Sequence, residues 1–442
     1  MKKAIKYLSG MKSRCFMLLT CLILLVSATS CSNDNFETNL PDEPKQLSKS
    51  ELLQKYSKAE LIEQALSRMP KTRGGNPNAV VMVTIQNSVQ LQCSVTDDMT
   101  IYYYNDGNEE SREVNQNIRE HNLVFTDSFP SHGITIVGSE DALQSLTVNN
   151  SGLILLDVSG NTKLGSLTCM DNYLDEIDLT GCLDLSTLTV ANNELISLDL
   201  TCFPNLFSLQ VENNRLMDLN LPESSSIFIL SMNNNQIKEL DLSGAPSLYI
   251  LEAANNPLRN LNLTQNTYLM YLDVSYSQIT DLDLSRNISL ETINLESTPI
   301  KKLNNDVFSD TSFAVFKELQ QLNVAHTSSL TALDLSNNSG VILVDISGSA
   351  VTQLDISGSQ ILYLYATRSK LTDLIYESRN FEKLYELRIE RTPFENEEIN
   401  IRRLSKNLPP KTVEIPGHLY TYSSYINMYY SDFKRINWLV NQ

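Results

Sequence analysis

A 21-residue repeat is the feature that most constrains how this chain folds. Units start at residues 141, 162, 183, 204, 225, 246, 267 and 288 with no slippage, and four further units start near 317, 339, 359 and 382. Segments such as DLSTLTVANNELISLDL and NLFSLQVENNRLMDLNL follow the pattern LxxLxVxxNxLxxLDL. Self-similarity at such a period is typical of a solenoid, in which each coil stacks on its neighbour and shares its core.

Equivalent positions of the units form columns, and two kinds of column explain the turns and the core. Apolar columns supply the core, for example Leu164, Leu167, Cys169, Leu174 and Ile177. An amide can both donate and accept hydrogen bonds, which suits a buried turn. The asparagine column consists of Asn172, Asn193, Asn214, Asn235 and Asn256. From the seventh unit its members are Ser277, Thr298, Thr327 and Ser349. Because a hydroxyl bonds the turn less completely, we expect a looser C-terminal half.

A second polar column carries aspartate between two apolar residues and before Ser or Thr. Its members are Asp157, Asp178, Asp199, Asp241, Asp283, Asp334 and Asp355. Calcium needs about six to eight oxygens around one point, and Asn220 and Asn262 interrupt the column. Hydrogen bonds from these side chains to their own turns explain the column more simply. The sequence therefore predicts no metal site.

The repeat resembles the leucine-rich-repeat family, in particular the 21-residue type with LDLS segments found in Bacteroidetes lipoproteins. The match covers about residues 141–392. The resemblance implies a repeat protein, a curved solenoid with a parallel sheet on its inner, concave face. It also implies a role in binding proteins or, less often, glycans, without naming a ligand.

The strand of each unit is expected around the LxV segment, so the residues that flank its apolar side chains point off the inner face. In the first units these residues are small, for example Ser145, Thr147 and Thr168. Later ones are larger, and we predict as ligand-binding residues Gln210, Glu212, Glu252, Tyr271, Asp273, Glu296, Asp345, Tyr363, Tyr365 and Arg388. Tyrosines offer contact area at low entropic cost, and acids around them would select a basic or hydroxyl-rich partner. A solvated face without a ligand is the alternative.

Residues 1–31 have the layout of an exported protein. A basic start leads through the apolar stretch from Phe16 to Val26 into ATSC at residues 28–31. This resembles a bacterial lipobox with Ala28 in place of the usual Leu. We predict a signal peptide over 1–30, lipidation at Cys31 and a polar tether over 31–47, whose SNDN start is similar to an export tag of surface lipoproteins. The predicted location is the cell-surface side of the outer membrane, reached only through the lipid anchor; plain secretion and a periplasmic orientation stay open.

Two short segments precede the repeats, and an aromatic tail follows them. Apolar spacing and a capping box at Ser48 and Glu51 predict an amphipathic helix over 48–69. Short alternating runs predict a small β-sandwich over 79–138, whose YNDG and GITIVG segments resemble the polycystic-kidney-disease (PKD) type. Both this sandwich and the tail over 393–442 are predicted to cap the solenoid, since its end coils need covering. A sugar platform is the alternative for the tail.

Charge and motifs limit the function classes. The formal charge of −18 argues against a nucleic-acid partner, because phosphates need clustered Lys and Arg. There is no GxxxxGK[ST], HExxH or GxSxG motif, so we predict a non-enzyme without a cofactor. Two classes stay open: a protein-binding surface module, which the long shallow face favours, and a glycan-binding accessory lipoprotein of a nutrient-uptake system.

The cysteines after Cys31 divide into two groups. Cys93 and Cys169 occupy apolar positions and are expected to be buried thiols. Cys182 and Cys202 end consecutive coils and could therefore stack, so they are a candidate disulfide in an oxidising compartment.

Overall fold

The fold prediction is confirmed by the computed structural model. The structure describes residues 56–68, 79–86, 88–105, 108–118, 120–126, 132–139, 141–222, 226–303, 316–377, 386–389, 391–393, 412–415, 418–421 and 427–429. These residues form a leucine-rich-repeat solenoid of stacked parallel strands, preceded by a short helix and a set of antiparallel strands. The predicted signal peptide, Cys31 and the tether lie outside the described residues.

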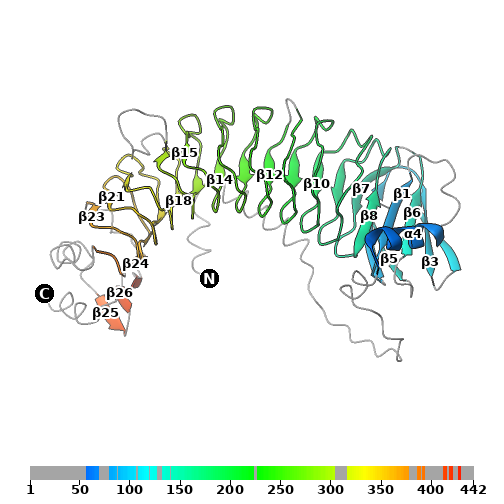
Figure 1. The fold of residues 1–442 in the computed structure, drawn as a ribbon, viewed down its shortest axis with the longest axis horizontal. Coiled ribbons are helices and arrows are strands. Elements are labelled where there is room, and N and C mark those ends of the chain that lie inside the picture. The colour runs from blue at the N-terminus through cyan, green and yellow to red at the C-terminus, as the bar shows by residue number, and fades with distance from the viewer. Residues whose placement is uncertain are drawn as a thin grey trace. The chain divides into compact units, whose positions relative to one another are not determined.

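One strand from each coil builds the main sheet, which Figure 1 shows as a row of short arrows side by side. Neighbouring strands pair in parallel and in the register of the repeat, so that Leu188 pairs with Leu167 on one side and Leu209 on the other. The strands are β7 (Leu143–Thr147), β9 (Ser166–Thr168), β10 (Thr187–Thr189), β11 (Ser208–Gln210), β12 (Ile229–Ser231), β13 (Ile250–Glu252), β14 (Tyr271–Asp273), β16 (Thr292–Asn294), β18 (Gln321–Asn323), β20 (Leu343–Asp345), β22 (Tyr363–Tyr365) and β24 (Glu386–Arg388).

A second side of each coil carries the aspartate column and forms shorter pairings. Its strands are β8 (Leu153–Asp157), β15 (Asp281–Leu282), β17 (Lys302–Leu303), β19 (Ala332–Asp334), β21 (Gln353–Asp355) and β23 (Asp373–Ile375). Single bridges join Asp157 to Asp178 and Asp199 to Asn220. The apolar columns lie between the two sides, and Leu164, Leu167 and Leu174 are fully buried.

The antiparallel strands before the repeats continue both sides of the first coil. β2 (Ser88–Val95) pairs with β5 (His121–Thr126) and also with β7 of the main sheet. β1 (Val80–Thr84) pairs with β6 (His132–Val137) and also with β8 of the second side. β3 (Met99–Asn105) and β4 (Asn108–Val114) complete that second sheet in the order β4-β3-β6-β1-β8. Both strand edges of the first coil are therefore paired, as a solenoid end requires. The PKD-type resemblance stays a prediction.

One apolar core runs through the antiparallel strands and the repeats. Val80 and Leu91 belong to the same buried cluster as Leu167 and Leu387. The helix α4 (Lys58–Arg68) packs on a second cluster, in which its Leu61 is fully buried. That second cluster includes residues of β1 and β8, so the helix covers the surface of this sheet that faces away from the main core.

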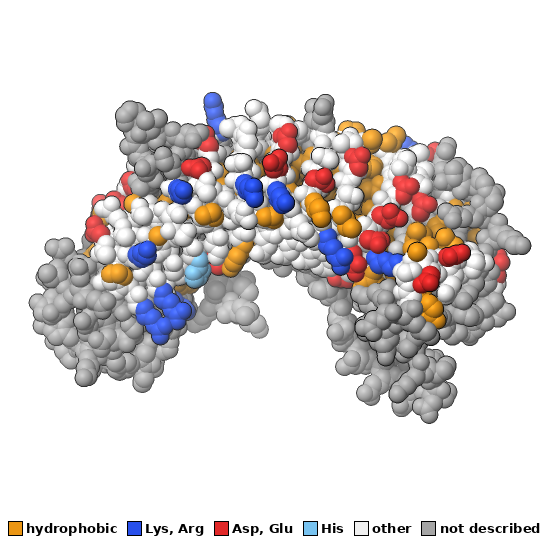
Figure 2. Space-filling model, viewed as in Figure 1, with side chains coloured by type: hydrophobic (Ala, Val, Ile, Leu, Met, Phe, Trp, Pro, Cys, Tyr) orange, Lys and Arg blue, Asp and Glu red, His pale blue; other side chains and the backbone are white. Residues whose placement is uncertain are grey.

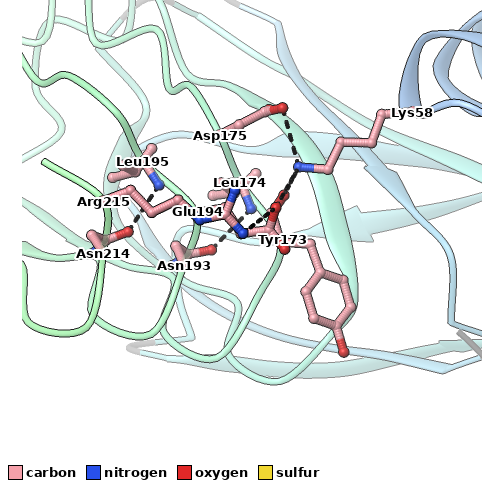
Figure 3. A network of polar contacts seen from close by, with 9 residues as sticks. All are labelled: Lys58, Tyr173, Leu174, Asp175, Asn193, Glu194, Leu195, Asn214 and Arg215. Carbon is pink, nitrogen blue, oxygen red and sulfur yellow. Dashed lines mark hydrogen bonds and ion pairs between the residues drawn. The ribbon is translucent and has the colours of Figure 1, made fainter. Parts of the chain in front are cut away.

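Lys58 fastens this helix to the second and third repeat units (Figure 3). Its Nζ donates to the carbonyl oxygen of Tyr173 at 2.6 Å. The same ammonium pairs with Asp175 at 3.1 Å and with Glu194 at 3.4 Å. Glu194 also pairs with Arg215 of the next coil at 3.5 Å. Because the Lys58 side chain is only 20% exposed, these contacts are less screened by solvent than ordinary surface pairs.

The asparagine column links each coil to the preceding one. Nδ2 of Asn214 donates to the carbonyl of Val190 in the preceding coil (3.0 Å) and to that of Val211 in its own coil (3.1 Å). Its Oδ1 accepts from the N–H of Leu195 in the preceding coil at 3.0 Å. Equivalent bonds between coils are made by Asn172, Asn193, Asn235 and Asn256.

The hydroxyl residues that replace these asparagines bond within their own coil. Thr298 and Thr327 each donate to a carbonyl three residues earlier, at 2.7 Å. Ser349 accepts from the N–H of Val351 at 3.3 Å. The expectation that a hydroxyl bonds the turn less completely is confirmed, since these side chains make no hydrogen bond between the described coils.

Three further strands follow the last repeat: β25 (Thr412–Ile415), β26 (His418–Thr421) and β27 (Asn427–Tyr429). β27 pairs in parallel with β24 and antiparallel with β26, and so extends the main sheet beyond the repeats. The predicted aromatic side chains of this tail are outside what the structure describes. Within the described part of the chain, no helix has the length and apolar character that crossing a bilayer requires.

Candidate binding face

Three columns of side chains project from the main sheet, and we call this surface the main face. They are the first and third residues of each three-residue strand and the second residue after it. The central strand residue points into the core, while its two neighbours are half-buried in β9, β14, β16 and β22. All the predicted ligand-binding residues occupy these columns, between β11 and β24. They therefore form a row along the solenoid rather than one compact cluster.

The first predicted group surrounds Ser231, between the carboxylates of neighbouring strands. The Ser231 hydroxyl donates to Glu252 Oε2 at 2.6 Å. Burial raises the pKa of Glu252, and the nearby Asp273 carboxylate raises it further. Burial likewise raises the pKa of Glu212. Gln210, also in this group, accepts from the Thr189 hydroxyl at 3.3 Å.

Two of the predicted acids are already engaged in holding their own turns. Oδ1 of Asp273 accepts from the N–H of Ser275 at 2.9 Å and from its hydroxyl at 2.7 Å. Oδ2 of Asp273 accepts from the amide of Asn294 at 2.9 Å. Oδ1 of Asp345 accepts from the N–H of Ser347 at 2.8 Å. Because these bonds stabilise the turns, fewer carboxylate oxygens of these two acids are available to a partner than their position on the face suggests.

Glu296 joins the main face to its rim. Its Oε1 accepts from the Tyr276 hydroxyl at 2.8 Å, and its Oε2 accepts from the Asn323 amide at 3.2 Å. The hydrogen bond to Glu296 raises the pKa of Tyr276. The Tyr276 side chain is 50% exposed, so this carboxylate and this ring present one continuous polar and aromatic surface to solvent.

In the last predicted group, an arginine lies next to a tyrosine, and acids occupy the neighbouring strand positions. The rings of Tyr363 and Tyr365 lie 6.3 Å apart at 49°. Asp345 pairs in register with Tyr365, and Glu386 pairs in register with Tyr363. The guanidinium of Arg388 lies 5.5 Å from the centre of the Tyr365 ring, which is a cation–π arrangement. The predicted residue Arg388 therefore supplies a cation next to Tyr365, in addition to the acid Asp345 on the neighbouring strand.

Sequence reasoning missed a column of left-handed residues directly before the asparagine column, which we call the rim column. Asn150, Asp171, Asn192, Asn213, Asn234 and Asn255 occupy it first, all with φ between 46° and 58°. Later members are Tyr276, Ser297, His326, Gly348, Arg368 and Arg391, with φ between 56° and 64°. Asparagine adopts this conformation more readily than other side chains do, and a left-handed backbone costs them about 1–2 kcal/mol each. The recurring Asn-Asn pairs were the available signal.

A second missed feature is a stack of aromatic rings just before the strands of the fourth to sixth units. Phe207 and Phe228 lie 5.2 Å apart at 7°, and Phe228 and Tyr249 lie 4.5 Å apart at 12°. Nearly parallel rings at this spacing cover each other's faces. The stack therefore presents ring edges, together with the 47% exposed Phe207 at its end.

The aspartate column holds turns, as predicted. Asp157, Asp199 and Asp334 each accept from the N–H two residues later, at 2.9–3.0 Å. Asn262 does the same for Thr264 at 3.1 Å. These bonds confirm the turn interpretation, and among the described residues no group of His, Cys, Asp and Glu could hold a metal ion.

The candidate disulfide is wrong. Cys182 and Cys202 are both free, and Cys182 is buried while Cys202 is exposed. The Cys182 thiol donates to the carbonyl of Val158 at 3.2 Å, and burial raises its pKa to about 12. The spacing of the two cysteines is one residue short of the repeat period, which puts the thiols in adjacent columns, one inside and one outside. Cys93 and Cys169 are buried thiols, as expected.

No protein-family model matches the chain, and no curated protein matches it. Among solved structures, the functional domain of InlJ from Listeria monocytogenes is 24% identical, with 56% of this chain and 67% of that chain covered and a TM-score of 0.41. A leucine-rich-repeat protein of Leptospira interrogans is 18% identical, with 60% and 81% covered and a TM-score of 0.43. The leucine-rich effector YopM of Yersinia pestis is 23% identical, with 57% and 84% covered and a TM-score of 0.35. Similarities this distant assign no function, which has to rest on the chain's own residues.

Proposed function

We propose that this chain is a non-enzymatic binding protein that takes a protein partner on the main face between β13 and β24. The observation that carries this proposal is the change of side chains along the face. Small residues such as Ser166 and Thr168 give way to Tyr271, Tyr363 and Tyr365, in register on parallel strands. Tyrosine and arginine are enriched at the centres of protein interfaces.

A protein is favoured over a glycan because a sugar ring stacks on an open aromatic face. In the stack of Phe207, Phe228 and Tyr249 the rings cover one another, and the Arg388 guanidinium lies over Tyr365. A long shallow face with tyrosines and opposite charges suits the broad contact of a protein.

The test replaces Tyr271, Tyr363 and Tyr365 together with alanine. The matched control replaces three exposed apolar side chains elsewhere, Ile196, Met217 and Ile288, which are 50–60% exposed. Surface proteins from neighbouring or host cells are crosslinked to each variant, and crosslinked peptides are identified by mass spectrometry. We expect crosslinks on β13–β24 that the face variant loses and the control keeps, with nearly equal melting temperatures. Crosslinks that survive the face variant, or binding found only on a glycan array, would refute the proposal.

We further propose that the chain is a lipoprotein on the outside of the outer membrane, anchored through Cys31. The lipobox-like ATSC and the polar tether support this location. Palmitate labelling that disappears in Cys31→Ser, and removal of the chain from intact cells by added protease, test the two parts. Labelling without protease sensitivity would place the chain on the periplasmic side and exclude contact with other cells.

A further inference from the structure

The end of the main face at β22 and β24 carries a concentration of arginines in an otherwise acidic chain. Arg388 is on β24, and Arg368 and Arg391 follow β22 and β24 by three residues each. Figure 2 shows Lys and Arg side chains gathered at the end of the repeats where β24 lies. The chain as a whole carries a charge of −18, so this group of positive charges runs against its general composition.

The backbone places two of these arginines side by side on the rim column. Tyr365 pairs with Arg388 across β22 and β24, so the residues three positions later, Arg368 and Arg391, are also neighbours. Adjacent strands lie about 4.8 Å apart, which lets two guanidinium groups reach one carboxylate or two consecutive acidic side chains. Both arginines are exposed, and neither is among the ion pairs found within the described part of the chain.

Three acids lie close to Arg368 and Arg391 in the sheet register or in the sequence. Asp345 on β20 already accepts a hydrogen bond from Ser347. Glu386 begins β24 and pairs with Tyr363, so it lies at the opposite end of that strand from the rim column. Glu390, next to Arg391 in the sequence, lies outside the described residues.

Both rim positions hold their arginines against a backbone preference. Arg368 and Arg391 have φ of 60° and 59°, in the column where the first coils place asparagine. Strained residues of this kind are frequent where a surface binds a ligand. Each arginine lies in the turn just beyond its strand, β22 or β24, and its planar fork fits carboxylates in a bidentate way.

We infer that Arg368, Arg388 and Arg391, together with Tyr365, form a docking site for an acidic segment of a protein partner. The inference rests on the proposed function and names the chemistry of one end of the contact. The acidic residues Glu252 and Glu296 lie further along the same face, so the partner's charge must change sign along the solenoid. Asp and Glu side chains meet the arginines, and basic side chains meet the glutamates.

The test uses a fluorescent Asp/Glu-rich peptide of about ten residues and its Asn/Gln counterpart as probes. The variant Arg368→Asn with Arg391→Asn restores the residue that earlier coils use at this position, so its melting temperature should equal or exceed that of the natural chain. The matched control, Lys238→Asn with Arg259→Asn, removes two exposed positive charges from another part of the repeats. Equal charge removal separates a local site from the field of the whole protein.

The acidic peptide should bind the natural chain with a salt-sensitive affinity and should bind the Arg368/Arg391 variant at least about 5-fold more weakly. The control variant should change the affinity less than about 2-fold. Equal loss in both variants, or equal binding of the Asn/Gln peptide, would overturn the site. If the peptide test fails but crosslinks on β13–β24 still depend on the three tyrosines, only the acidic-segment site is wrong. If the crosslinks do not depend on the tyrosines, the proposed function itself is wrong. A molar mass in light scattering that rises with protein concentration in the absence of peptide would indicate a second copy as occupant and would also overturn the site.

Discussion

Replacing Asn214 with alanine tests whether the asparagine column is what couples one coil to the next. Its amide donates to the carbonyls of Val190, Val211 and Glu212, and its Oδ1 accepts from the N–H of Leu195. The side chain is 8% exposed, so water replaces few of these bonds directly. The substitution therefore removes one acceptor and one donor group from a buried turn.

The magnitude follows from which partners keep another bond. The carbonyl of Val190 still accepts from Asn193 at 3.1 Å, and that of Val211 still accepts from Asn235 at 2.9 Å. The N–H of Leu195 has no such second acceptor among the described residues, and a buried donor without an acceptor costs about 1–3 kcal/mol. The weakened carbonyl bonds add about 0.5–1 kcal/mol. The free energy of unfolding should fall by about 1.5–4 kcal/mol in total.

Urea denaturation followed by far-UV circular dichroism measures this loss, with native-state hydrogen exchange as a check that the same coils open. Thr298→Ala should lose about 1 kcal/mol, because it removes a single bond within one coil. Asn260→Ala, on an exposed asparagine, should stay within about 0.5 kcal/mol of the natural chain. If Asn214→Ala and Thr298→Ala were equally destabilising, the asparagines would not couple the coils and the reasoning would be refuted.

Four further predictions address the helix, the rim, the thiols and the turns. Lys58→Ala should lower the free energy of unfolding by about 1–2 kcal/mol in urea denaturation, since two ion pairs and a bond to a carbonyl are lost; no loss would mean that apolar packing alone holds α4. Gly348→Ala should lower the melting temperature, because φ is +64° and the new Cβ would collide with the His326 ring, whereas Gly165→Ala has no contact under 3.8 Å and should change little. Iodoacetamide should modify Cys202 in the folded chain, with the other described thiols reacting only after unfolding, and intact mass should be the same with and without reductant; an increase of about two daltons on reduction would restore the disulfide. The Asp199 carboxyl should titrate in NMR below its ordinary pKa of 3.8, because it accepts hydrogen bonds from its turn. The stability that this carboxylate contributes is present above its pKa in the unfolded chain and is lost as the pH falls through its pKa in the folded chain. This pH dependence of stability should be absent in Asp199→Asn.

The repeat made most of the architecture predictable, because its 21-residue period assigns every position to a column. The leucine of each LxV segment had to point inward and its neighbours outward, and the roles of Asn214 and Asp199 followed from the hydrogen bonds a turn needs. The same period also explains why Cys182 and Cys202 do not lie in one column, since their spacing is one residue short of it.

Other features depend on contacts between distant segments and carried no local signal. The pairing of β1 with β8 and of β2 with β7 joins the antiparallel strands to the first coil, and sequence patterns give strand ends but not strand partners. The bonds of Asp273 and Asp345 to their turns likewise appear only when the backbone is in place. The sequence placed Arg388 among the predicted ligand-binding residues, but its position over the Tyr365 ring of the preceding coil appears only in the structure.

Two adjacent columns change at the same point of the solenoid, and their joint change bears on where the partner binds. An Asn-Asn pair serves both columns well, since its first residue tolerates a left-handed backbone and its second bonds the preceding coil. From the seventh unit onward the pairs become Tyr276-Ser277, His326-Thr327 and Arg368-Ser369. In these pairs the first residue is less suited to a left-handed backbone, and the second makes no bond to the preceding described coil. Local departures from the most stable choice are expected where another requirement acts on the same residues. The main face gains its tyrosines and its arginines over these same units, which is the distribution expected if the proposed partner binds there.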